Sequence, residues 1–136
     1  METPKRVAII HKDSELISVL ANIARGRGYS TATMVVGGAT RAVEVASFVR
    51  DANPNLVLLA ENYQGNTFTP ERGSKVGEGI EALAEIRRSG YARPIFMVSG
   101  NPLYEKRAMQ EGANSYLNLP ITIDKFREFL ASNTQS

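Results

Sequence analysis

Four short apolar runs in this chain are each followed by, or end in, residues at which reactive or ligand-binding side chains could lie. His11, Lys12 and Asp13 follow the first run, Ser99 and Asn118 lie at the ends of two later runs, and the remaining run ends in Ala60. A lysine and a histidine beside a single carboxylate favour the binding of an anion over that of a cation. Because a methyl group offers no reactive atom, Ala60 contributes nothing to such chemistry.

The usual catalytic motifs are missing from the sequence. It has one histidine and no cysteine, so thiolate chemistry, a disulfide framework and a cysteine–histidine metal site are excluded. The glycine pairs Gly37-Gly38 and Gly77/Gly79 lack the full phosphate-binding fingerprints, and no serine lies in a Gly-x-Ser-x-Gly turn. We therefore expect no catalytic residues, no resident metal and no cofactor, and we do not expect an enzyme.

Length and composition predict one globular domain. The chain has 136 residues, 43% hydrophobic and 22% charged, and a formal net charge of +2. The charges are interspersed, so direct contact with nucleic acid is not expected. No apolar run approaches the roughly 20 residues of a membrane span, and we expect a cytoplasmic protein. The domain is predicted over residues 1–131, with residues 132–136 as a linker or disordered tail.

Apolar runs and helical periodicity alternate along the chain. Strands are predicted at 7–10, 31–36, 56–59, 94–99 and 116–119, and helices from Asp13 or Ser14 to Gly26, and at about 40–51, 78–88, 102–110 and 123–131. The second strand is less hydrophobic and is predicted to lie at an edge, whereas 56–59 should be central. The polar stretch 61–77 is unusually long for a loop.

Five strands that alternate with five helices predict an α/β fold. The expected architecture is a flavodoxin-like (βα)5 three-layer sandwich, with a parallel sheet in the order 2-1-3-4-5. In such a sheet the working crevice lies at the carboxyl ends of the first, third and fourth strands. The potentially reactive residues all follow strands, so this edge is where they are expected to meet.

Four segments, in the right order, resemble landmarks of the receiver domains of bacterial two-component response regulators. They are Arg6–Asp13, Pro54–Ala60, Pro94–Gly100 and Glu111–Pro120. The resemblance extends from about Arg6 to Leu130. It implies the CheY-like receiver fold and a role in signal transduction.

The positions that carry the chemistry in that family are altered here. The resemblance places Ala60 where the family has its phosphoacceptor aspartate, and a phosphoryl group needs a nucleophile such as a carboxylate. Leu119 stands at the position of the family's lysine. Of the residues that contact the phosphoryl group, Ser99 is retained. The resemblance thus implies an atypical receiver, or pseudo-receiver.

The family's metal-binding acids are altered too. His11 and Lys12 occupy the positions of two adjacent acids that help to hold Mg²⁺, an ion that prefers oxygen ligands. Asp13 resembles the family's third acid. Lys12 either neutralises Asp13 or Glu61 or is simply solvated. His11 is either pH-sensitive or, as we expect more, a hydrogen-bonded surface residue.

Two further positions leave alternatives open. Glu61 is a conceivable substitute phosphoacceptor, although successive strand residues point to opposite faces of a sheet. Ser99 and Tyr116 resemble the family's switch pair. Without a phosphoryl group we expect Tyr116 to be fixed, either inward in the core or outward as a contact residue.

The expected function is that of a non-phosphorylatable receiver-like signalling module, which acts through a protein partner or a homodimer. By family analogy the contact face is helix four, strand five and helix five. Candidate contact residues are Tyr104, Lys106, Arg107, Tyr116 and Arg127, and the loop 64–77 is a second candidate surface. The polar tail is compatible with a following output domain, as in a two-component transcriptional regulator.

Two other functions are open. The degenerate pocket, rimmed by His11, Lys12, Ser99 and Asn118, would suit a sensor for a small anion or metabolite. Phosphorylation on a residue other than Ala60 is the third hypothesis.

Overall fold

Five parallel strands form one sheet in the order β2-β1-β3-β4-β5. The computed structural model describes residues 5–37, 40–60, 78–99, 105–118 and 122–132. The strands are β1 (Arg6–His11), β2 (Ser30–Val35), β3 (Leu56–Ala60), β4 (Ile95–Ser99) and β5 (Ser115–Asn118). The helices are α1 (Ser14–Gly26), α2 (Ala42–Ala52), α3 (Glu78–Arg88), α4 (Glu105–Gln110) and α5 (Ile123–Ser132). The predicted flavodoxin-like topology is confirmed.

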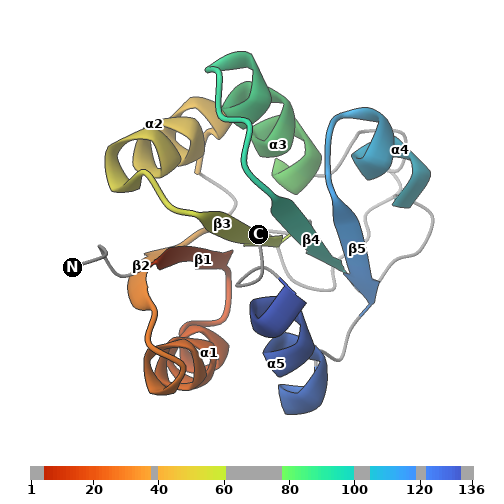
Figure 1. Cartoon of the computed structure of the whole chain (residues 1–136). Coiled ribbons are helices and arrows are strands. Elements are labelled where there is room, and N and C mark those ends of the chain that lie inside the picture. The colour runs from red at the N-terminus through yellow and green to blue at the C-terminus, as the bar shows by residue number, and fades with distance from the viewer. Residues whose placement is uncertain (1–4, 38–39, 61–77, 100–104, 119–121, 133–136) are drawn as a thin grey trace.

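Helices cover both faces of the sheet. Figure 1 shows α2, α3 and α4 on one face and α1 and α5 on the other. All residues of β3 are buried, because a parallel strand between two helical layers is shielded on both sides. The β2 strand is half exposed and forms an edge. Both predictions, a central third strand and a second strand at an edge, are therefore correct.

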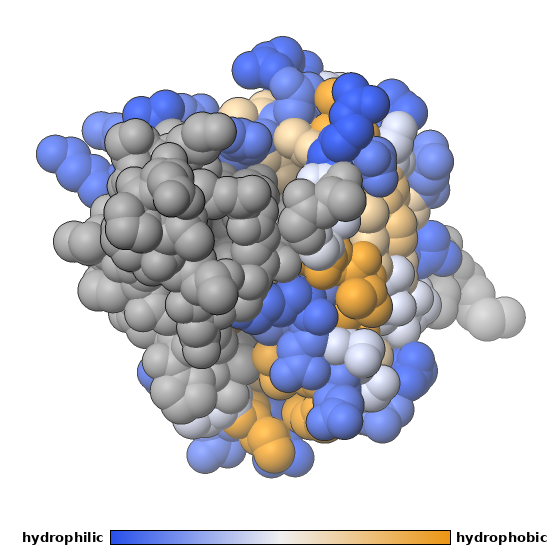
Figure 2. All heavy atoms as spheres, turned by 180° about the vertical axis from the view of Figure 1, so that it is seen from behind, coloured by the Kyte–Doolittle hydropathy of each residue, from blue (hydrophilic) through white to orange (hydrophobic). Residues whose placement is uncertain are grey.

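Two hydrophobic clusters make up the core, one on each side of the sheet. The first packs Ile10, Leu59 and Met97 against α2 and α3, and the second packs Ile9 and Leu58 against α1 and α5. Ile9 and Ile10, and likewise Leu58 and Leu59, contribute to opposite clusters, as the alternation of side chains along a strand requires. On the side seen from behind, hydrophobic side chains also reach the surface in small groups among hydrophilic ones (Figure 2).

The helix boundaries differ from the predicted ones by one or two residues where local hydrogen bonds intervene. α2 begins at Ala42 and not near Thr40, because Thr40 closes a turn: its Oγ1 accepts from the Gly37 N–H at 2.9 Å. The predicted start of the fourth helix, Pro102, lies outside the described residues. α5 continues to Ser132, which the sequence had assigned to the tail. None of the helices in the described part is long and apolar enough to cross a membrane.

Arg87, the penultimate residue of α3, joins two connecting segments at the edge of the sheet where the strands begin. Its five N–H donors match five hydrogen bonds. Nε and Nη2 donate to the Gly112 carbonyl at 3.0 and 2.8 Å, Nη2 also donates to Asn114 Oδ1 at 2.8 Å, and Nη1 donates to the carbonyls of Tyr91 and Arg93 at 2.9 and 2.8 Å. Every acceptor is neutral.

The turn that carries one of these acceptors is shaped around the arginine. Gly112 has φ +111°, and a Cβ atom there would lie 3.0 Å from Arg87 Cγ. Asn114 Oδ1 also accepts from the Ile95 N–H at 2.9 Å. The α4–β5 turn, the α3–β4 loop and the start of β4 are therefore held by one side chain.

Replacing Arg87 with lysine should destabilise the protein strongly. An ammonium has three donors and no planar fork, so it leaves several carbonyl groups unsatisfied. We expect Arg87→Lys to lower the free energy of unfolding, measured with urea, by about 2–4 kcal/mol. The neighbouring Arg88→Lys is the control, because Arg88 forms an exposed ion pair with Glu85, and exposed pairs contribute at most about 1 kcal/mol. Equal losses for the two variants would contradict the role assigned to Arg87.

Candidate functional site

The carboxyl ends of the strands bring the sequence-predicted residues to one edge of the sheet. His11 ends β1, Ala60 ends β3, Ser99 ends β4 and Asn118 ends β5. β3 lies between β1 and β4. His11 and Ala60 directly follow the paired residues Ile10 and Leu59, so they lie at the same level of the sheet. This is the edge at which open α/β sheets bind ligands.

Ala60 is enclosed at this edge. It pairs in register with Val98 of β4 and is only 2% exposed. Its methyl group belongs to the same hydrophobic cluster as Leu59 and Met97. The position therefore adds packing to the core and presents neither a nucleophile nor a metal ligand.

His11 is buried and hydrogen-bonded. It is 5% exposed, and its Nδ1 accepts from the backbone N–H of Asp13 at 3.0 Å. Burial lowers the pKa of the imidazole below its ordinary value of 6.5; Asp13 opposes this shift and Lys12 adds to it. The expectation of a surface histidine is thus wrong, because the end of β1 is covered. A nitrogen that accepts a hydrogen bond carries no proton, so the imidazole of His11 is uncharged when it makes this contact.

Asp13 is engaged in capping α1. Its Oδ1 accepts from the backbone N–H groups of Glu15 at 3.0 Å and Leu16 at 3.3 Å. A side-chain cap of this kind satisfies N–H groups that have no partner within the helix. Lys12 is partly exposed, and the ion pairs of the described region do not include one between Lys12 and Asp13.

The described side chains at this edge do not fit a magnesium ion, which the fold family would lead one to expect. Mg²⁺ requires several oxygen ligands in octahedral geometry. His11 accepts a hydrogen bond, Lys12 carries a positive charge, and the carboxylate of Asp13 caps a helix. Within the described ranges, no three histidine, cysteine or acidic side chains gather in a way that could hold a metal ion.

Several predicted residues lie outside the part of the chain that the structure describes. These are Glu61, the loop 64–77, Tyr104 and Leu119. Ser99 and Asn118 are the last residues of β4 and β5, and their backbones pair in register with each other.

The predicted contact residues divide into buried and exposed ones. Tyr116 of β5 is 7% exposed and packs in the core, so of its two alternatives the inward one holds, and it is not an exposed contact residue. Lys106 and Arg107 of α4 and Arg127 of α5 are exposed.

Two exposed apolar residues of the same region were missed by the sequence reasoning. Met109 is 45% exposed on α4, and Ile123 is 50% exposed at the start of α5. Helical periodicity alone does not reveal them, because it does not show how much of a short helix its neighbours cover.

Comparisons with solved structures agree with this geometry. The receiver domain of NtrX from Brucella abortus has a TM-score of 0.72 and 21% identity, over 96% of this chain and 99% of that one. The CheY-like receiver domain protein from Methanospirillum hungatei JF-1 has a TM-score of 0.73 and 19% identity, over 98% of both chains. The BeF3-activated receiver domain of RstA from Klebsiella pneumoniae has a TM-score of 0.74 and 13% identity, over 97% and 100%.

Structural similarity at 13–21% sequence identity establishes the fold alone, and this fold is that of response-regulator receiver domains. No model of a known protein family matches the sequence, and no curated protein matches it.

The buried histidine should make stability depend on pH. Because the pKa of His11 is lower in the folded protein than the ordinary 6.5, the unfolded chain binds a proton first on acidification. The free energy of unfolding should therefore be highest above pH 6.5 and should fall as the pH drops below that value. Urea unfolding across this range measures the effect.

The variant His11→Asn is the matched control, because asparagine keeps an acceptor near the position of Nδ1 but does not titrate. Its stability should fall less steeply below pH 6.5 than that of the wild type. Parallel pH profiles for the two proteins would show that His11 does not cause the dependence.

Proposed function

We propose that this chain is a receiver-like signalling module that is not phosphorylated and acts through protein–protein contact. The observation that carries the proposal is Ala60, a buried methyl group at the end of the central strand β3. In the receiver fold the resemblance in sequence assigns this position to the phosphoacceptor. Alanine has no atom that can attack phosphorus.

The neighbouring residues support the same proposal. A receiver needs acidic side chains next to the acceptor to hold Mg²⁺. Here His11 is neutral and bonded to the backbone, and Asp13 is used as a helix cap. The site therefore lacks its acceptor, and the described side chains beside it do not offer a metal-binding set.

The α4–β5–α5 face is the contact surface that we propose. Of the six described residues of α4, only Ala108 is buried. Met109 and Ile123 expose apolar surface. The charged side chains of α4 and α5 are of both signs: Lys106, Arg107 and Arg127 lie among Glu105, Asp124 and Glu128, and Arg107 pairs with Glu111 at 3.4 Å. Exposed apolar side chains with charged neighbours suit a protein partner or a second copy of the chain. Such a module would serve as the regulatory domain of a two-component-type transcriptional regulator.

An anion or metabolite sensor remains the alternative. It now depends mainly on Lys12, because His11 is enclosed and its Nδ1 is already bonded. The geometry favours the interaction module.

Phosphorylation chemistry gives a direct test. The purified protein is incubated with acetyl phosphate and Mg²⁺, and its intact mass is recorded beside that of a receiver domain that has its aspartate. We expect no phosphoryl mass shift for this chain, since Ala60 cannot accept the group. Beryllofluoride should likewise leave its thermal unfolding unchanged. A shift in the wild type that disappears in Glu61→Gln would identify Glu61 as a substitute acceptor and would refute the proposal.

The contact face is tested by the oligomeric state. If the partner is a second copy, sedimentation should show a dimer, and Met109→Glu with Ile123→Glu should convert it to a monomer, because burying an unpaired carboxylate in an interface is costly. Val19→Glu with Val43→Glu is the matched control, since both valines are 47% exposed but lie on α1 and α2. A dimer that survives the first pair and dissociates with the second would contradict the assigned face.

A further inference from the structure

Basic residues gather at the edge of the sheet opposite the candidate site. This edge, named here the arginine edge, comprises residues 5–6, 25–30, 50–55, 85–94 and 111–114, where strands begin and helices end. Its basic residues are Lys5, Arg6, Arg25, Arg27, Arg50, Arg87, Arg88 and Arg93, and its acids are Asp51, Glu85 and Glu111. Eight basic and three acidic side chains give a formal charge of +5, whereas the whole chain carries +2.

Hydrogen bonds show that the arginine edge is continuous on the side of β2 and β1. Arg25 Nη1 donates to Thr31 Oγ1 at 3.2 Å, beside Ser30, whose Oγ accepts from Arg6 Nε at 3.2 Å. Arg6 Nη1 then donates to the Ala52 carbonyl at 2.9 Å. These contacts link the starts of β2 and β1 to the end of α2.

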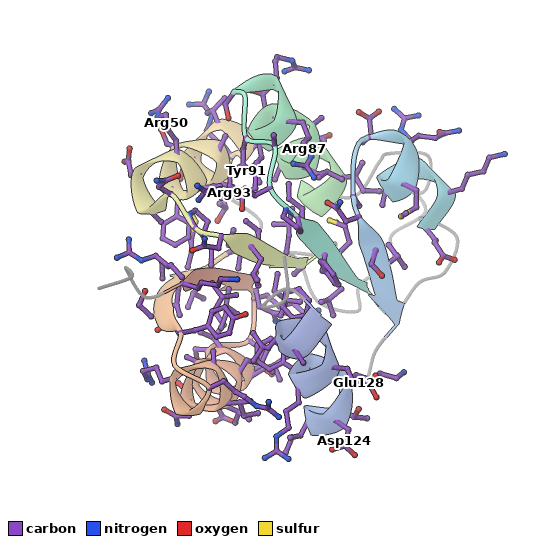
Figure 3. The ribbon with its side chains drawn as sticks, viewed as in Figure 1. Arg50, Arg87, Tyr91, Arg93, Asp124 and Glu128 are labelled. Atoms are coloured by element: carbon purple, nitrogen blue, oxygen red, sulfur yellow. The ribbon has the colours of Figure 1, made fainter. Side chains whose placement is uncertain are left out.

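The same chain of contacts continues to β4 and β5. Arg93 Nη1 and the Tyr91 hydroxyl both donate to the Pro54 carbonyl, at 3.1 and 3.0 Å. Arg87 in turn bonds the Arg93 carbonyl. Figure 3 shows Arg50, Arg87 and Arg93 on the same side of the molecule, while the acidic Asp124 and Glu128 lie on α5, on the other side of the sheet. Positive charge thus extends across neighbouring strands that are about 4.8 Å apart.

This positive charge is only slightly neutralised within the arginine edge. The acceptors that hold Arg6, Arg87 and Arg93 are carbonyl, hydroxyl and amide oxygens. Arg50 approaches the Asp51 carboxylate at 3.8 Å, with side chains 65% and 80% exposed, and such a pair is weak. Arg88 pairs with Glu85 at the surface. Arg87 has used all five of its donors and contributes charge only, whereas the side chains of Arg27, Arg50 and Arg88 are exposed and can be reached by a partner.

Helix dipoles explain part of this arrangement but not all of it. Cations are favoured in the last turn of a helix, where carbonyl groups carry partial negative charge. This accounts for Arg25, for Arg27 at the C-cap of α1, and for Arg50, Arg87 and Arg88. It does not account for the other three basic residues, which lie in a strand or in connecting segments: Lys5, Arg6 and Arg93.

We infer that the arginine edge is a docking surface for a carboxylate-rich segment of a partner protein. Guanidinium groups pair with carboxylates through two parallel hydrogen bonds, which gives strength and orientation. A continuous phosphate backbone fits less well, because the 80% exposed carboxylate of Asp51 lies within the surface. Tyr91, whose hydroxyl bonds Pro54, and the buried Tyr29 are not free to stack on bases.

This surface is separate from the α4–β5–α5 face. It uses residues from the ends of α1, α2 and α3 and the starts of β1 and β4. The module would therefore have two contact surfaces, one with exposed apolar side chains and one that is electrostatic. The second adds to the proposed function and is tested independently of it.

The test measures binding of a fluorescent glutamate peptide by anisotropy. About eight extended residues suffice to cross four strands, which span roughly 15 Å. A glutamine peptide of equal length and a short DNA duplex are compared, each at low and at physiological salt. We expect the glutamate peptide to bind, its affinity to fall with salt as screening shortens to about 8 Å, and the glutamine peptide not to bind.

Two triple variants of equal charge locate the site. Arg27→Gln, Arg50→Gln and Arg88→Gln remove three exposed charges of the arginine edge, and Lys106→Gln, Arg107→Gln and Arg127→Gln remove three from α4 and α5. The first set should weaken binding about tenfold or more, and the second by less than about threefold. Urea unfolding confirms that both remain folded.

Three outcomes would overturn the inference. They are absence of binding by the glutamate peptide, equal losses for both triple variants, or tighter binding of the DNA duplex with the same dependence on Arg27, Arg50 and Arg88. The last outcome would make this edge a nucleic-acid surface. None of them alters the phosphorylation or sedimentation results, so failure here is distinguishable from failure of the proposed function.

Discussion

The direction of the chain through a parallel sheet is the constraint on which the rest of this structure depends. Each strand is followed by a helix that returns to the opposite edge, so all strand ends meet at one edge and all helix ends meet at the other. The first edge collects His11, Ala60 and the ends of β4 and β5. The second collects arginines that are far apart in sequence. Both candidate surfaces are products of this one geometry.

Arg87 shows how the second edge is held together without acids. Its guanidinium is satisfied by neutral oxygens from one loop and one turn. Burial lowers the pKa of this group, and Tyr91 opposes the shift, yet arginine remains charged in proteins. Burial also raises the pKa of Tyr91 to about 12, so its hydroxyl keeps the proton that it donates to Pro54. Because no carboxylate enters this network, the positive charge persists at the surface.

The first edge illustrates the opposite outcome, since His11, Asp13 and Ala60 are engaged within the fold. Asp13 caps α1, and the accepting Nδ1 of His11 bonds the backbone two residues later. Ala60 completes a hydrophobic cluster. These contacts use local groups to close the end of β1 and the start of α1. An edge that binds phosphate and metal in a typical receiver is, in the described residues, organised for packing.

Much of the fold followed from local patterns, because strand and helix periodicity do not depend on distant contacts. The bounds of α3 and the central position of the strand predicted at 56–59 followed from these patterns, and the order of the sheet followed from the alternation of strands and helices together with the rules for crossovers. Errors of one or two residues arose at helix ends, where a side chain such as that of Thr40 closes a turn. The chemical identity of Ala60 was also decided by sequence, since no tertiary contact can make a methyl group nucleophilic.

Burial and the gathering of charge were decided by the tertiary structure alone. His11 was expected at the surface, and only the packing around the end of β1 shows that it is enclosed and neutral. Tyr116 had two possible positions, and the packing of the core selects the inward one. The basic residues are interspersed along the chain, yet eight of them meet at one edge. A linear sequence fixes which charges exist, but the distance between them, which governs their electrostatic effect, is set when the crossovers bring helix ends together.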